Sequence, residues 1–221
     1  MRGALLSLIL AAPLAASPSS LRVTFIGNAA FAITDGRSTL YTDFPYRSGA
    51  FGYMTYDRAS VPDVADSICL VTHGHADHFD PDLFRTRKSL LIAPASAAAG
   101  VPRSRVLPFA PKMSWRGIEV EAFPTPHGSI EHDSYLVTWH GLRLYLTGDT
   151  DSPDRLLAMR DLDVAFVTPW LLAAIEKQGA RIDARQIVVC HHRPGERVTT
   201  WQRPRVPSQG ETFVVERPPT D

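Results

Sequence analysis

The chain has 221 residues, and its 23 Lys and Arg balance 23 Asp and Glu, so the formal net charge at neutral pH is zero. A balanced charge gives no electrostatic basis for nucleic acid or an anionic membrane surface as a bulk partner. Hydrophobic residues make up 44% of the chain, and its length is typical of one α/β domain of about 200–250 residues. We therefore expect one domain with a substantial core.

The first residues carry the pattern of a secretory signal. A short basic start precedes an apolar stretch at 4–10, and small residues follow up to Ser17. Because the apolar stretch is shorter than a bilayer-spanning helix, we predict cleavage after Ala16 or Ser17, with an uncleaved anchor as the alternative. The prediction is a signal peptide at 1–17 and one domain at 18–221. The mature protein would be periplasmic or secreted and would not contact the membrane.

Strands are predicted at 21–26, 31–34 and 38–42, which together form an opening β-meander. The segment 44–56 breaks this pattern because its aromatic residues are interleaved with Pro and Gly. Two interpretations of this segment stay open: it lines a cleft and selects an apolar or ring-bearing substrate, or it packs at the edge of the core.

A buried strand predicted at 68–72 leads directly into His73-Gly74-His75-Ala76-Asp77-His78. Three imidazoles and a carboxylate this close together suit a divalent metal, zinc first, with manganese or iron as alternatives. The competing interpretation is a solvated, histidine-rich loop. Asp80 as N-cap and Pro81 as the first helical residue predict a helix directly afterwards. The cluster is therefore predicted to lie in a strand-to-helix loop.

The second half alternates strands and helices. Strands are predicted at 90–93, 106–107, 118–123, 135–139, 142–147, 164–168, 187–190 and 212–215, and helices at 153–160 and 171–178. A β-rich first half followed by β-α-β-α-β predicts an α/β fold in which two sheets are sandwiched between outer helices.

Further potential metal ligands follow later strands. They are His127, Asp149, and either His191 or His192. Taken alone, each is more often a surface or turn residue than a ligand. Strand ends that meet at one edge of a sandwich would, however, bring them to the cluster at 73–78. The cysteines, Cys69 and Cys190, are predicted to be buried free thiols in preference to a disulfide.

In these motifs and their order, from Val23 to about Val215, the sequence resembles the metallo-β-lactamase superfamily. The resemblance implies an αββα four-layer sandwich and a centre with two zinc ions per chain. It also implies that His73, His75 and His127 hold one ion, that Asp77, His78 and the late histidine hold the other, and that Asp149 bridges both. Of the late pair we prefer His191, the first residue after its strand, to His192.

The resemblance further implies hydrolysis by a metal-bound hydroxide, with Asp77 orienting water or accepting a proton. Metal lowers the pKa of bound water from about 15.7 towards 7. Two divalent ions together with Asp77, Asp149 and one hydroxide leave the centre with a net charge of about +1, which favours a small, anionic substrate. His75 stands where the oxygen- or nitric-oxide-reducing branch has an acidic residue, which favours hydrolysis over redox chemistry. Asp149 stands where one antibiotic-degrading zinc branch has Cys, which argues against a β-lactamase.

Among the branches of the superfamily, the sequence most resembles the one that includes ascorbate-phosphate lactonase and phosphodiesterase-like enzymes. An ester, lactone or phosphodiester is therefore predicted as substrate. Gly27-Asn28-Ala29 departs from the Gly-His-Ala of many members. The alternatives are a β-lactamase-like or acyl-lactone hydrolase and a non-catalytic metal- or ligand-binding module. His132 is interpreted as a substrate contact or proton donor near His127, or as a surface residue. Asp43 is interpreted as a support for a metal-bound histidine or as a turn residue.

Overall fold

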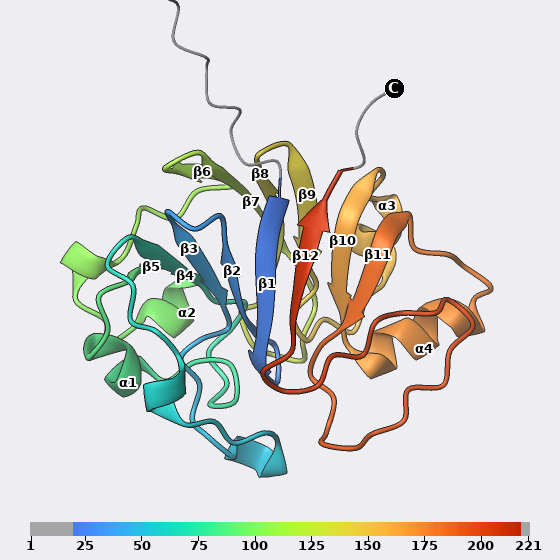
Figure 1. Ribbon diagram of the computed structural model, residues 1–221, viewed down its shortest axis with the longest axis horizontal. Coiled ribbons are helices and arrows are strands. Elements are labelled where there is room, and N and C mark those ends of the chain that lie inside the picture. The colour runs from blue at the N-terminus through green and yellow to red at the C-terminus, as the bar shows by residue number, and fades with distance from the viewer. Residues whose placement is uncertain (1–19, 218–221) are drawn as a thin grey trace, which may run out of the picture.

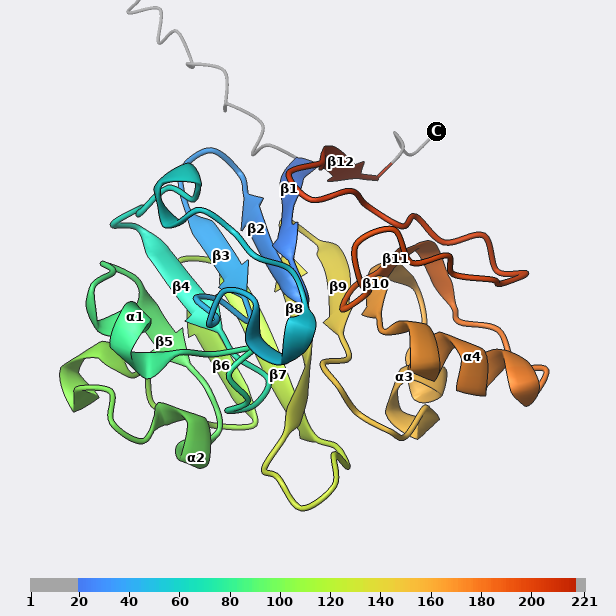
Figure 2. The same ribbon diagram turned by 90° about the horizontal axis from the view of Figure 1, so that it is seen from below.

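The computed structural model describes residues 20–217, whose strands form two six-stranded sheets (Figures 1 and 2). The first sheet has the order β12 (Thr212–Glu216), β1 (Ser20–Gly27), β2 (Ala30–Thr34), β3 (Thr39–Thr42), β4 (Ser67–Leu70), β5 (Leu90–Ile92). The second has the order β11 (Ala184–Val189), β10 (Leu162–Val167), β9 (Leu142–Leu146), β8 (Asp133–Trp139), β7 (Ile118–Pro124), β6 (Lys112–Trp115).

Helices lie on the outer sides of the two sheets. Figure 2 shows α1 (Pro81–Arg85) and α2 (Ala95–Ala98) beside the first sheet, and α3 (Asp154–Ala158) and α4 (Pro169–Lys177) beside the second. Short 3₁₀ turns occur at Ala50–Gly52, Arg58–Ser60 and Arg103–Arg105. The predicted αββα four-layer sandwich is confirmed.

The core has three parts, one between the sheets and one between each sheet and its outer helices. Strand β1 shows how the sequence selects a face: Leu21, Val23 and Phe25 are fully buried between the sheets, whereas Arg22 and Thr24 point the other way. Each such buried side chain stabilises the fold by about 1.5–3 kcal/mol. Separate clusters join the first sheet to α1 and α2, and the second sheet to α3 and α4.

Strand directions bring four loops to one edge of the sandwich. In the second sheet, β9, β10 and β11 are parallel, and β7 runs with them because both β7 and β9 are antiparallel to β8. The loops that follow β7, β9 and β11 therefore leave from the same edge. In the first sheet β4 is parallel to β3 and β5, and the predicted metal cluster directly follows β4.

Local signals begin α1 and end α4 as predicted. The Asp80 carboxylate accepts hydrogen bonds from the backbone N–H groups of Asp82 (3.0 Å) and Leu83 (3.1 Å), so it is the N-cap of α1. Helix α4 begins earlier than predicted, at Pro169, where the Thr168 hydroxyl accepts from the Leu171 N–H. It ends just before Gly179, which has a left-handed φ of 68°.

Other element predictions also need correction. At 106–107 there is only an isolated parallel bridge, between Val106 and Leu91, and not a strand. Strand β6 escaped prediction because it is a half-exposed edge strand with two polar positions. The helix predicted at 153–160 is shorter, since Pro153 has no side-chain cap to offer and Met159 is extended.

The structure describes the two cysteines but not the predicted signal peptide. Cys69 and Cys190 are both buried and free. The predicted signal peptide at 1–17 lies outside the described residues. Within 20–217, no helix is long and apolar enough to cross a membrane.

Candidate metal centre

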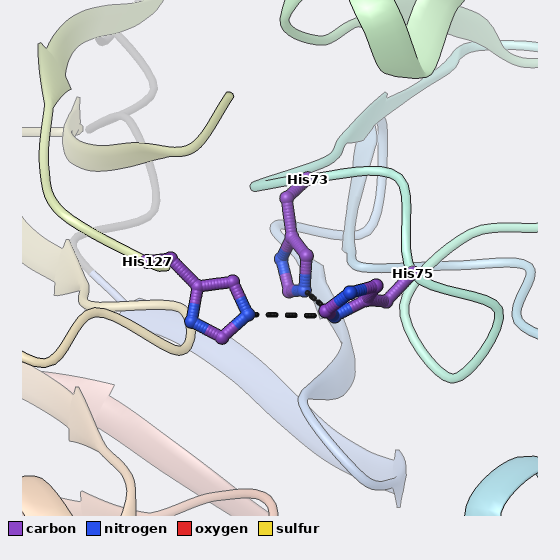
Figure 3. Close-up of side chains that lie close together, drawn as sticks. All are labelled: His73, His75 and His127. Atoms are coloured by element: carbon purple, nitrogen blue, oxygen red, sulfur yellow. Dashed lines mark hydrogen bonds between the residues drawn. The ribbon is translucent and has the colours of Figure 1, made fainter. Parts of the chain in front are cut away.

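Three histidines from two loops face one another, as Figure 3 shows. His73 and His75 follow β4, and His127 follows β7. The distance from His73 Nε2 to His75 Nδ1 is 3.0 Å, and that from His127 Nε2 to His75 Nδ1 is 3.4 Å. A tetrahedral zinc ion with Zn–N bonds of about 2.0–2.1 Å holds its ligand nitrogens about 3.3 Å apart. The spacing therefore suits one zinc ion.

A second group lies beside the first and contains Asp77, His78 and His191. Asp77 Oδ2 is 3.0 Å from His191 Nε2 and 4.0 Å from His78 Nε2. Asp149, which follows β9, joins the two groups: its Oδ2 lies 3.2 Å from His78 Nε2 and 3.3 Å from His191 Nε2. It also forms a ligand-like group with His73 and His78. All seven predicted ligands therefore come together at one edge of the sandwich.

Unpartnered buried atoms show that this donor set fits metal ions. Asp77 Oδ1 and Asp149 Oδ1 are buried and have no hydrogen-bond partner among the described residues. Leaving such an acceptor unsatisfied costs about 1–3 kcal/mol, and more for an ionised one. Imidazole nitrogens together with carboxylate oxygens are ligands that zinc prefers, so a bound cation, or a water molecule held by it, would satisfy these atoms.

Asp43, directly after β3, forms contacts that position the histidines of the cluster at 73–78. Its buried carboxylate accepts hydrogen bonds from the Thr72 N–H (2.7 Å) and the Thr72 hydroxyl (3.0 Å). The Thr72 hydroxyl in turn lies 3.0 Å from His73 Nδ1. The second Asp43 oxygen approaches His78 Nδ1 at 3.0 Å. These contacts are those expected of a support for His73 and His78, and they are more than an ordinary turn residue makes.

His132 is buried, so the predicted surface position is wrong, whereas a substrate contact or proton donor near His127 stays a prediction. Its Nε2 accepts a hydrogen bond from the Asp149 N–H at 3.0 Å, and its Nδ1 lies 2.9 Å from the Thr125 hydroxyl. Burial, with a smaller effect of His127, lowers the pKa of His132 to about 3. The ring is therefore neutral, and its Nε2 can accept the hydrogen bond from the Asp149 N–H. This hydrogen bond positions the loop that carries Asp149.

A family model described as the beta-lactamase superfamily domain matches residues 22–169. The chain belongs to the metallo-β-lactamase superfamily. No curated protein sequence gives a significant match.

Solved structures of this superfamily resemble the chain in fold. A protein of Parabacteroides distasonis assigned as a metal-dependent hydrolase is 22% identical, with a TM-score of 0.62 over 80% of this chain and 84% of that one. The metallo hydrolase Igni18 of Ignicoccus hospitalis is 14% identical, with a TM-score of 0.61 over 90% of this chain and 100% of that one. A diphosphatase of the PhnP family is 14% identical, with a TM-score of 0.57 over 89% of this chain and 98% of that one.

Burial and charge set the protonation states at this superfamily site. Burial works against the ionised form of Asp149, but the neighbouring His78 and His191 outweigh it and hold the pKa of Asp149 well below its usual range. Burial acts to raise the pKa of Asp77, but the hydrogen bond from His191 and the charges of His78 and His191 together outweigh burial and lower it. Burial and the charge of His78 depress the pKa of His73. Two ionised carboxylates and a neutral imidazole are the forms that bind metal.

His78 differs because it lies between two carboxylates. Burial acts to lower the pKa of His78, yet the charges of Asp149 and Asp43 outweigh this and raise it well above the usual value. The two carboxylates therefore favour a proton on both ring nitrogens of His78 in the metal-free protein, and metal binding would displace one of these protons.

Asn28 links three parts of the site without reaching solvent. Its side-chain amide donates to the Asp77 carbonyl (3.2 Å), and its side-chain oxygen accepts from the Met54 N–H (2.9 Å). Its backbone carbonyl accepts from the His191 N–H at 2.6 Å. Where many members of the resembled branch have a histidine, this chain has a fully buried structural link.

The two late histidines point in different directions. His191 lies against Asp77, whereas both ring nitrogens of His192 lie near backbone carbonyls, those of Arg193 (3.2 Å) and Pro207 (3.1 Å). The His192 ring also stacks on Phe25. The structure thus brings His191 to the site and keeps His192 in the core.

The segment 44–56 has some residues in the core and others beside the candidate metal site. Phe44, Tyr46 and Met54 are buried and pack in the core. Phe51 and Tyr53 instead lie at the site: the ring centroid of Tyr53 is 4.2 Å from that of His191, and the centroid of Phe51 is 6.2 Å from that of His75. The sequence predicts where this segment lies, but it does not show which of its aromatic residues are buried and which lie beside the ligands.

Proposed function

We propose that the protein is a hydrolase that binds two divalent metal ions, zinc by preference with manganese or iron as alternatives. Its substrate would be a small, anionic ester, lactone or phosphodiester. The observation that supports this most is that Asp149 approaches both ligand groups, so one carboxylate can serve two ions. Membership of a superfamily that contains metal-dependent hydrolases supports the same reaction class.

The residues divide between the two ions as the sequence resemblance implies. His73, His75 and His127 would hold one ion, Asp77, His78 and His191 the other, and Asp149 both. When bound, such ions supply a water of lowered pKa and an electrophilic site for a carbonyl or phosphoryl oxygen.

The protein itself orients the substrate and handles protons. His75 and His127 are only partly buried, whereas His73, His78 and His191 are buried, so a substrate reaches the centre from the side of His75 and His127. Asp77 is ionised, and its Oδ1 has no partner among the described residues. It can therefore accept a proton from water and return it to the leaving group, which makes Asp77 the proposed catalytic residue.

The experiment is turnover by zinc-loaded protein of p-nitrophenyl acetate, a γ-lactone and bis(p-nitrophenyl) phosphate. We expect hydrolysis of at least one of them, and a loss of roughly a hundred-fold or more in His75→Ala together with lost zinc. His140→Ala is the matched control, because His140 is an exposed histidine in the β8–β9 turn. Fully zinc-loaded wild-type protein that is inert on the whole panel would favour the non-catalytic binding module.

We also propose export, because of the signal-like pattern before Ser17. Expression of the full chain in a Gram-negative host should give a mature N-terminus after Ala16 or Ser17 in the periplasmic fraction. A full-length cytoplasmic product would contradict this proposal.

A further inference from the structure

We infer that the substrate carries, besides the scissile bond, a flat apolar group and a second anionic group, and that four residues beside the metal ligands bind them. These residues, called the rim, are Phe51, Tyr53, Trp170 and Arg193. The inference rests on the proposed function and adds the chemistry of the substrate to it.

Two aromatic rings from distant segments meet at the ligand His191. Tyr53 lies edge-on to it, with centroids 4.2 Å apart and planes at 87°, and Trp170 lies 5.2 Å away at 74°. Trp170 is in the first turn of α4 and remains 37% exposed. An apolar group of a substrate held at the metal centre would therefore meet aromatic surface immediately beside the ligand.

Phe51 extends this surface towards the first ligand group. Its side chain is 67% exposed, and its backbone has a left-handed φ of 51°, which is unfavourable for a bulky residue. A large exposed ring on a strained backbone, beside the ligand His75, gains nothing from the core. Such strain concentrates at functional sites, and binding a flat apolar group would give this ring a partner.

Arg193 places a positive charge beside the Tyr53 ring. It comes two residues after His191, its side chain is exposed, and its guanidinium carbon lies 5.4 Å from the centre of the Tyr53 ring. Among residues 20–217 no carboxylate forms an ion pair with this guanidinium; the contact from Glu196 is to the Arg193 backbone N–H. An unpaired guanidinium held on an aromatic ring is suited to a carboxylate or phosphate.

The test uses non-hydrolysable probes that differ by one group. Calorimetry measures the binding of 3- and 4-carboxyphenylphosphonate, phenylphosphonate and methylphosphonate to zinc-loaded protein. The first two probes compared with phenylphosphonate give the effect of the carboxylate. Phenylphosphonate compared with methylphosphonate gives the effect of the phenyl ring. In the wild type the carboxylate should improve affinity about ten-fold for the better isomer, and the ring should improve it further. In Arg193→Gln the carboxylate should no longer help.

Arg181→Gln is the matched control. Arg181 is also an exposed arginine on an aromatic ring, 5.0 Å from the centre of Trp201, but it follows the C-terminal end of α4, whereas Trp170 is at the other end. This variant should keep the full preference for the carboxylate. Trp170→Ala should reduce the benefit of the phenyl ring and leave zinc content unchanged.

The outcomes separate the two proposals. Zinc-loaded protein that hydrolyses no ester yet shows the Arg193-dependent preference overturns the proposed function alone. Protein that hydrolyses esters while Arg193→Gln keeps the wild-type preference overturns the rim alone. Equal binding of phenylphosphonate and methylphosphonate by the wild type, or no binding of any probe, also overturns the rim.

Discussion

At the scale of single residues, Asp43 illustrates how one buried carboxylate can organise a metal site. It fixes the backbone and hydroxyl of Thr72, which contacts His73, and it approaches His78 directly. A histidine from each ligand group thus depends on one side chain. Residues of this kind orient ligands and tune their basicity without touching the ion.

Asp43→Asn should therefore weaken zinc binding by about 10–100-fold, because the amide removes the negative charge beside His78 and cannot accept from Thr72 in the same way at both oxygens. Zinc affinity is measured by competition with a chelator, and circular dichroism checks that the fold is kept. Wild-type affinity in a folded variant would contradict the role given to Asp43.

Asp133 gives a prediction about pH. Burial, and to a lesser degree Glu131, raises the pKa of Asp133 from the usual 3.8 to about 6. A carboxyl group with a raised folded-state pKa contributes its stability below the unfolded pKa and loses it as the pH rises through the folded pKa. The contribution of Asp133 is therefore present below pH 3.8 and is lost between there and pH values above 6.

Asp133→Asn stays neutral at every pH, so at pH 8 its free energy of unfolding should exceed that of the wild type by about 1–3 kcal/mol. At pH 4 the difference should be much smaller. Urea denaturation in the presence of EDTA at both pH values measures this. A pH-independent difference would show that Asp133 does not titrate in this range.

At the scale of elements, the turn after β9 places Asp149 through very close packing. Gly148 has a left-handed φ of 56°, and a Cβ atom there would collide with the His132 ring and lie 2.8 Å from Thr72 Cβ. Gly128, in the loop that carries His127, has a similar φ of 54° but open space around it. The two glycines thus separate the effect of backbone conformation from that of contact.

Gly128→Ala should cost about 1 kcal/mol, which is the penalty of the left-handed conformation alone. Gly148→Ala should cost about 1–3 kcal/mol more because of overpacking, and it should also lower zinc affinity by displacing Asp149. Urea denaturation of both variants in EDTA and zinc titration give the comparison. Equal losses of stability would mean that the turn can relax away from His132.

The elements also show what the sequence could predict. Strands with alternating burial, such as β1, and caps with a specific chemistry, such as Asp80, were predicted because their signals are local. The half-exposed edge strand β6 has no such signal. The burial of His132 has no local signal, because it depends on contact with the Asp149 loop, 17 residues further along the chain.

At the scale of the whole molecule, two sheets of parallel and antiparallel strands bring four separate loops to one edge. The sequence motifs and the family resemblance predicted the ligand set, and the strand directions explain why the set meets. The rim could not be predicted as a unit, since Tyr53, Trp170 and Arg193 lie on three segments joined only by the tertiary fold.

Because the site carries buried, ionised carboxylates, metal binding should stabilise the whole domain. A ligand that binds only the folded state adds about 4 kcal/mol when its free concentration is a thousand times its dissociation constant. Zinc should therefore raise the thermal midpoint, and EDTA should reverse the change. In the Asp149→Asn variant the rise should be much smaller, and an undiminished rise would show that zinc binds elsewhere.

The stoichiometry of metal in the purified, folded protein tests the two-ion site most directly. Elemental analysis after zinc loading and removal of free metal should give about two zinc ions per chain for the wild type, and fewer for His127→Ala and for His191→Ala. The His192→Ala protein should keep both ions, since His192 packs on Phe25 and faces backbone carbonyls. A folded wild-type protein that retains one zinc ion or none would contradict the binuclear centre.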